Sequence, residues 1–194
     1  RAGASPGGDG SVSAPFPTLG EGIAAAKTAG DGTAVLIASG VYDESVMIDA
    51  ELHLWGGWTS DFACLSGEAT TIRSAFDDVA AVTIQDTADA SLHRLTAAGK
   101  FVASGSDLSI GLDVADATVL LDQVRVQSHA PADEQTRRAH GLIGRRAIVE
   151  IRDSTILAGK ASLGATAIDA CSTELTLATS TIHHQNQASA AGEA

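Results

Sequence analysis

Four segments of the chain repeat one arrangement of apolar and polar residues. In each segment, apolar and polar residues alternate, the alternation breaks briefly, and a second short alternating run follows. The segments are centred on Leu92, Leu121, Ile151 and Leu177, so the pattern recurs at similar strides along the chain. Alternation with a period of two predicts β-strands with one buried face. A repeat of about 20 to 50 residues is typical of a solenoid.

One repeat has room for three short strands and their turns, which make one coil of a β-solenoid. Stacked coils lie about 4.8 Å apart, and one coil cannot bury its own inner face, so several coils are needed. We therefore expect an all-β fold, a β-solenoid of about five coils. Asp122 and Arg152 follow the central residue on successive coils, so we expect them to pair across neighbouring rungs.

The N-terminal part of the chain predicts an arm followed by a helix. Residues 1–15 are rich in Gly, Ser and Pro, which is typical of a linker or tail. Residues 16–194 then form a single β-helix domain. Thr18 and Glu21 have the spacing of a capping box, so a helix over about 18–30 is expected to cover the first coil.

Shorter segments follow this helix. The apolar run 34–37 predicts a buried strand, residues 40–44 predict a turn, and residues 45–48 predict a second strand. Two polar or Gly/Ser-rich stretches, 99–110 and 128–141, interrupt the repeat and predict loops, which are the usual place for function on a solenoid.

The N-terminal third resembles a known group of proteins. A helix, a strand, a G-x-Y-x-E segment and an L-x-L-x-G-G-aromatic segment are similar to the start of right-handed parallel β-helix repeat proteins. These belong to the pectin-lyase-like superfamily, in its secreted bacterial type. The residues that carry the resemblance are Pro17, Ile23, Ala26, Gly40, Tyr42, Glu44, Leu52, Leu54, Gly56, Gly57 and Trp58, with a later repeat at Ser180, Ile182, Asn186 and Ala188.

The resemblance implies an all-β right-handed parallel β-helix and an extracellular or cell-surface location, but no single function. The group includes lyases, hydrolases, adhesins and inert spacers. Many such proteins stack asparagines at one turn, whereas Asn186 is the only asparagine in this chain. We therefore expect small residues to fill that corner. The chain begins at Arg1 rather than Met, as a processed product or a fragment would.

Charge and composition exclude several partners. The chain has 12 basic and 24 acidic residues, a net charge of −12, and no basic stripe. This argues against nucleic acid and against an anionic membrane surface, and no apolar run is long enough to cross a membrane. Cys64 and Cys171 lie about three coils apart, roughly 14 Å. A disulfide needs Cα atoms within about 7 Å, so we expect no intrachain bridge; a bridge between stacked subunits stays open.

Candidate functional residues are scattered, and no catalytic residue, cofactor or metal is expected. The weak metal candidates fit no known ligand spacing; they are His129, Glu134, His140 and His183. A ligand surface is expected at Trp55, Trp58, Asp133, Arg137 and Arg138. Two carboxylates, Asp122 and Asp153, have the separation along the repeat that a glycosidase could use. No spacing supports a Ser-His-Asp arrangement, although spacing alone does not exclude one. A column of threonines that could bind ice is interrupted by Arg125.

These observations favour a non-enzymatic structural β-solenoid, extracellular or at the cell surface, that associates end to end into a filament. The alternative is a carbohydrate-binding or adhesive module that uses the wall beside the two tryptophans and the 128–141 stretch. A polysaccharide lyase or glycoside hydrolase is a less favoured interpretation.

Overall fold

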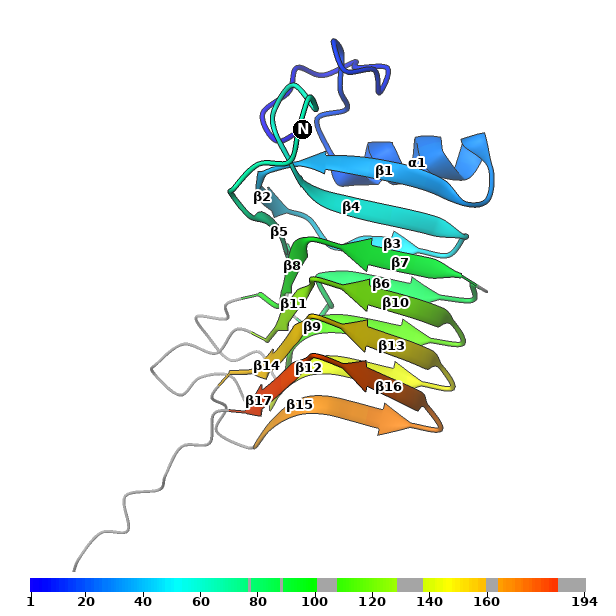
Figure 1. The fold of residues 1–194 in the computed structure, drawn as a ribbon, viewed down its shortest axis with the longest axis vertical. Helices are drawn as coiled ribbons and strands as arrows, with labels where there is room; N and C mark the ends of the chain where they lie inside the picture. Colours follow the sequence, from blue (N-terminus) through cyan, green and yellow to red (C-terminus); the bar gives the residue numbers. More distant parts are fainter. Residues whose placement is uncertain (77, 88, 101–107, 129–137, 160–163, 185–194) are drawn as a thin grey trace, which may run out of the picture.

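The computed structural model shows a parallel β-solenoid with one short helix at its N-terminal end (Figure 1). It describes residues 1–194 except 77, 88, 101–107, 129–137, 160–163 and 185–194. The all-β parallel solenoid and the helical cap that the sequence predicts are therefore confirmed. No helix among the described residues is long and apolar enough to cross a membrane.

Three parallel sheets form the walls of the solenoid, and each successive strand along the chain belongs to the next wall. The first sheet consists of β1 (Thr33–Ala38), β4 (Leu52–Trp58), β7 (Ala90–His93), β10 (Thr118–Asp122), β13 (Ile148–Arg152) and β16 (Glu174–Ala178). The second consists of β2 (Gly40–Asp43), β5 (Thr70–Arg73), β8 (Leu95–Ala98), β11 (Arg125–Gln127), β14 (Thr155–Ala158) and β17 (Thr181–His184). The third consists of β3 (Val46–Ile48), β6 (Val82–Gln85), β9 (Leu108–Ala115), β12 (Arg138–Arg145) and β15 (Gly164–Cys171).

The repeated apolar residues stack in register inside the solenoid. Leu54, Leu92, Leu121, Ile151 and Leu177 are partners on successive strands of the first sheet. The first four of them are fully buried. The solenoid makes about four turns, slightly fewer than the five coils predicted.

From β7 onward, each bend between the first and second sheets is made by one residue in the left-handed conformation. Arg94, Gln123, Asp153 and Thr179 occupy this place on successive coils, with φ between 46° and 56°. Left-handed backbone reverses the side-chain alternation in a single step, which explains the break in the sequence pattern. A second such column, Asp86, Asp116, Arg146 and Ser172, makes the bend between the third and first sheets.

A glycine at one of these bends should stabilise the protein. Left-handed backbone costs an L-residue about 1 kcal/mol, and glycine avoids that cost. We expect Asp153→Gly, at φ 46° and exposed, to raise the free energy of unfolding by about 0.5 to 1 kcal/mol in urea titrations. The control, Thr155→Gly in strand β14, should lower it by a similar amount. Equal losses in both variants would contradict the prediction.

Small hydroxyl residues fill the corner after this bend. Ser154 Oγ accepts a hydrogen bond from Val124 N at 2.9 Å and lies 2.6 Å from the Arg152 carbonyl oxygen, to which it donates. On the next coil, Ser180 Oγ accepts from Ser154 N at 3.2 Å. The expectation that small residues fill this corner is met by serine on these two coils only, since Leu95 and Val124 stand there on the two preceding coils.

Helix α1 (Leu19–Ala29) closes the N-terminal end, lying across β1 at the top of the stack (Figure 1). Thr18 caps it as predicted, accepting from Glu21 N at 3.2 Å. Glu44, from the turn after β2, adds a second cap by accepting from Leu19 N at 3.0 Å. A carboxylate at a helix N-terminus is favoured by the helix dipole. The glutamate of the G-x-Y-x-E segment therefore fixes the cap to the first coil.

The arm of residues 1–15 is held by its own chain. The amino group of Arg1 donates to the Phe16 carbonyl oxygen at 2.7 Å, and Ala2 N donates to the Tyr42 hydroxyl at 3.1 Å. Such an arm could be ordered by a neighbouring molecule or by its own chain. These two hydrogen bonds are made with its own chain.

Three local expectations were wrong. Residues 40–43 form strand β2 rather than a turn, because Tyr42 points inward, is buried and donates to the Ala38 carbonyl oxygen. The two predicted loops are shorter, since their last residues already belong to β9 and β12. Asp122 and Arg152 are neighbours in the register, as predicted. However, Arg152 pairs with Glu150 of its own strand instead.

Candidate functional site

Five side chains gather on the outer face of the first sheet, near its N-terminal end. His53 and Trp55 lie on β4, Ser91 and His93 on β7, and Asp122 at the end of β10. The register pairs His53 with Ser91, Trp55 with His93, and His93 with Asp122. Because alternate residues of a strand point to the same face, all five project from the wall rather than into the core.

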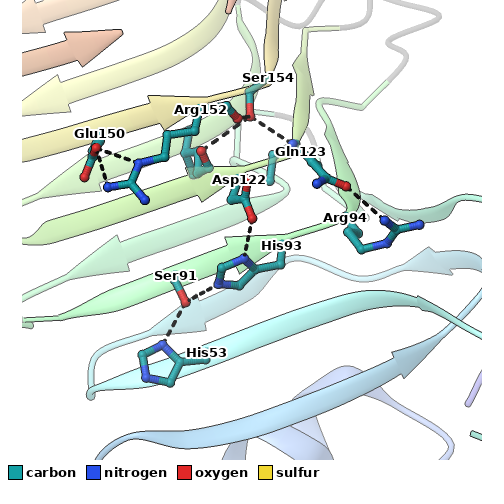
Figure 2. Close-up of polar contacts among 11 residues, drawn as sticks. His53, Ser91, His93, Arg94, Asp122, Gln123, Glu150, Arg152 and Ser154 are labelled. Atoms are coloured by element: carbon teal, nitrogen blue, oxygen red, sulfur yellow. Dashed lines mark hydrogen bonds and ion pairs between the residues drawn. The ribbon is translucent and has the colours of Figure 1, made fainter. Parts of the chain in front are cut away.

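Four of these side chains form one continuous chain of hydrogen bonds (Figure 2). His53 Nδ1 lies 2.7 Å from Ser91 Oγ, and Ser91 Oγ lies 2.8 Å from His93 Nε2. His93 Nδ1 lies 3.2 Å from Asp122 Oδ2. Ser91 therefore sits between two imidazoles, one of which is held by a carboxylate. We call these four residues the His–Ser–His–Asp chain.

The chemistry of the groups fixes the direction of these hydrogen bonds when both imidazoles are neutral. An ionised carboxylate can only accept, so Nδ1 of His93 carries the proton and donates to Asp122. Nε2 of His93 then accepts, and the group beside it is the Ser91 hydroxyl. Ser91 donates its one proton to His93 and accepts from Nδ1–H of His53. Every donor in the His–Ser–His–Asp chain thus points toward Asp122.

Packing holds the His–Ser–His–Asp chain rigid. The rings of Trp55 and His93 are stacked, with centroids 4.2 Å apart and 23° between their planes. Ser91 and His93 are 4% and 8% exposed although they face outward, whereas the Asp122 side chain is 32% exposed. Aromatic stacking of this kind contributes about 0.5 to 1.5 kcal/mol beyond burial. The imidazole of His93 is therefore fixed on its face by Trp55 and on both edges by hydrogen bonds.

A second polar pair borders this site at the bend of the solenoid. Arg94 Nη1 donates to Gln123 Oε1 at 2.9 Å across neighbouring coils (Figure 2). Arg94 also lines a shallow hollow of about 290 Å³ with Glu68 and Arg125. Its Nε is buried and makes no hydrogen bond within the part of the chain that the structure describes.

The residues predicted to form a ligand surface do not gather on one wall. Trp55 belongs to the first sheet, whereas Arg138 begins β12 of the third sheet. One face of Trp55 is covered by His93. Trp58 is only partly exposed, and its Nε1 is buried. Asp133 and Arg137 lie outside the described residues. Carbohydrate binding at this wall stays a prediction.

The predicted metal ligands are also distributed over different walls. His140 lies on β12 and His183 on β17, which belong to the third and second sheets. His129 and Glu134 lie outside the described residues. Among the residues that are described, no group of three His, Cys, Asp or Glu side chains could hold a metal ion. Cys64 and Cys171 are both exposed with free thiols.

His140 should make the stability of the protein depend on pH. Burial lowers the pKa of His140 below its ordinary 6.5, although Asp169, whose Oδ2 lies 3.5 Å from Nδ1, opposes the shift. As the pH falls below about 6.5, the unfolded chain binds a proton that the folded chain resists, so stability decreases. Urea titrations between pH 7.5 and pH 5 should show a smaller decrease for His140→Gln than for the wild type. Parallel curves for the two proteins would contradict the prediction.

No protein-family model matches the chain, and comparison with curated proteins and with solved structures gives no significant match. The chain is a β-solenoid. Membership of the pectin-lyase-like superfamily stays a prediction, since none of these comparisons supports it. The fold alone does not indicate a function, because one fold can carry many functions.

The sequence contains the signal for the His–Ser–His–Asp chain, but spacing along the chain hides it. Ser91 and His93 alternate with Leu92 on one strand and so share a face. Asp122 follows His93 at the same stride at which Leu121 follows Leu92, which is the stride of the repeat. The two observations together place a Ser-His-Asp set on one wall, which the spacing of these residues along the chain does not reveal.

Proposed function

We propose that the chain is a structural β-solenoid, extracellular or at the cell surface, that associates with a second copy through its C-terminal coil. One observation carries this proposal: the core column becomes exposed at the last rung that the structure describes. Ile151 and Ile156 are 0% exposed, whereas their partners on the next coil, Leu177 and Ile182, are 46% and 41% exposed. Apolar surface of this kind favours association, at about 25 cal/mol per Å² removed from water.

The backbone of the last coil supports the same proposal. Strands β15, β16 and β17 are the terminal strands of the three sheets, each with one edge that no other described strand pairs. Unpaired edges of this kind are templates for a further strand. Helix α1 protects the opposite end, and its outward side chains include Glu21 and Lys27. Two C-terminal coils facing each other would form a self-complementary contact that closes as a dimer. A head-to-tail filament would instead place an apolar coil on this polar helix.

Sedimentation velocity at several concentrations tests the proposal. The wild type should associate, and Leu177→Glu with Ile182→Glu should shift it to the monomer. The matched control is Ile148→Glu, since Ile148 is 49% exposed but lies on the strand before the last coil; it should associate as the wild type does. A wild type that remains monomeric at every concentration would refute self-association, as would one that the double substitution leaves associated.

A further inference from the structure

We propose that Ser91 is a nucleophilic serine, activated by His93 and Asp122, and that it cleaves small carboxylic esters by acyl transfer. This activity goes beyond the structural role and does not depend on self-association. It would revise the expectation from the sequence that the chain is not an enzyme.

The distances meet the requirements of such a triad. A serine and its base need to lie within about 2.6 to 3.2 Å, and Ser91 Oγ lies 2.8 Å from His93 Nε2. The base must in turn be oriented by a third group, and Asp122 Oδ2 lies 3.2 Å from His93 Nδ1. The required tautomer of His93, with its proton on Nδ1, is the one that Asp122 imposes. Strands hold all three residues, which positions them more tightly than loops would.

His53 acts as a positioning residue in this arrangement. Its Nδ1–H donates to Ser91 Oγ and leaves the serine proton free to point at His93. Without His53, the Ser91 hydroxyl would lose the hydrogen bond that it accepts, but it could still donate its proton to His93. We therefore expect substitution of His53 to weaken, not to abolish, the activation of Ser91.

The reaction balances without any group that the protein lacks. Ser91 Oγ attacks the carbonyl carbon of the ester while His93 Nε2 takes the hydroxyl proton. The tetrahedral intermediate expels the alcohol, which receives that proton from His93, and an acyl ester of Ser91 remains. Water then attacks this ester with His93 as the base, releasing a carboxylic acid and restoring the serine. The net change is one ester and one water converted to one acid and one alcohol.

Burial limits the substrate and the rate. Ser91 is 4% exposed, so only a small acyl group such as acetyl can reach its hydroxyl. Strand β7 lies inside a sheet, between β4 and β10, where backbone N–H groups are used by the ladder. The backbone N–H groups of β7 are therefore not available as oxyanion donors, and the Nδ1–H of His53 is already bonded to Ser91 Oγ. Since one oxyanion-hole donor is worth about 10² to 10³ in rate, we expect rapid acylation by activated esters followed by slow turnover.

Covalent labelling of the wild-type chain tests the proposal directly. The protein is incubated with 4-nitrophenyl acetate, whose acyl group is small enough to reach Ser91, the acyl-protein is trapped with acid, and the acetylated peptide is identified by mass spectrometry. Ser91 should carry the label. Ser154 and Ser180, whose hydroxyls bond backbone groups, are internal controls and should not. A folded wild type whose Ser91 stays unlabelled, or is labelled no faster than these serines, would overturn the proposal.

Variants then separate activation from simple accessibility. The initial burst of nitrophenol from 4-nitrophenyl acetate should disappear in Ser91→Ala. Its rate should fall about 100-fold or more in His93→Gln and Asp122→Asn, because general-base catalysis contributes about 10² to 10⁴. The matched control is His183→Gln, since His183 is exposed on β17, in another sheet; its burst should equal that of the wild type. Decreases of less than 10-fold in both folded triad variants would overturn the assignment of His93 as the base.

Discussion

Leu121→Ala should lower the free energy of unfolding by about 2 to 5 kcal/mol, the range for truncating a leucine in a packed core. Leu121 is 0% exposed and is stacked between Leu92 and Ile151 in the middle of the solenoid. A cavity there is bounded by two rungs of backbone whose separation is set by hydrogen bonds, so the coils have little freedom to collapse into it. Urea unfolding followed by circular dichroism measures the loss.

The neighbouring residue offers a matched control for this variant. Leu120 lies next in the chain but points to the opposite face, where it is partly exposed. Leu120→Ala should therefore cost less than about 1 kcal/mol, because less apolar surface is returned to water. Similar losses in both variants would mean that the inward and outward faces of β10 are assigned incorrectly.

Gly141→Ala should be among the most damaging exchanges of a glycine for alanine in the chain. A Cβ atom at Gly141 would lie 2.6 Å from the Ala167 carbonyl oxygen and 2.8 Å from that of Leu157. Both contacts are with backbone, so one strand has to move rather than one side chain. Overpacking of this kind costs about 1 to 3 kcal/mol, and we expect the upper end of that range in urea titrations.

The control for this variant is Gly67→Ala. A Cβ atom at Gly67 meets nothing within 4 Å, and the residue has no positive φ. Its replacement should leave stability unchanged, or raise it slightly by restricting the unfolded chain. If Gly141→Ala were as stable as Gly67→Ala, the close approach of β12 to β14 and β15 would not be a constraint on the fold.

The sequence predicts the regular part of the fold because the same physical demand recurs on every coil. From Leu92 onward, an inward apolar residue must recur at each rung, and the nearly constant stride to Leu121, Ile151 and Leu177 reveals it. Between Leu54 and Leu92 the interval is longer than this stride, since the 59–69 connection is inserted there. The repeat alone therefore does not place His53 beside Ser91, and only the strand pairing does.

Side-chain pairing is less predictable than register. The sequence places Asp122 beside Arg152 and the structure agrees, yet Asp122 bonds His93 on the preceding coil and Arg152 bonds Glu150. Each charged side chain has neighbours above it, below it and at the next outward position of its own strand. The choice among these depends on rotamers and on burial by Trp55, which a pattern of apolar and polar residues does not contain.

The closed N-terminal end has a consequence for how the protein is made. Helix α1 and β1 leave the ribosome before the other described elements of the solenoid, and together they form a covered end at which β1 can pair with β4. From β4 onward, each strand pairs with a strand of the coil before it, which is already synthesised, so each coil can fold as it leaves the ribosome. Synthesis in the opposite direction would begin with a coil that has nothing to fold on. The cap thus acts as a template for growth in the direction of translation, and its loss should lower the yield of folded protein in cells more than it lowers the stability of the purified chain.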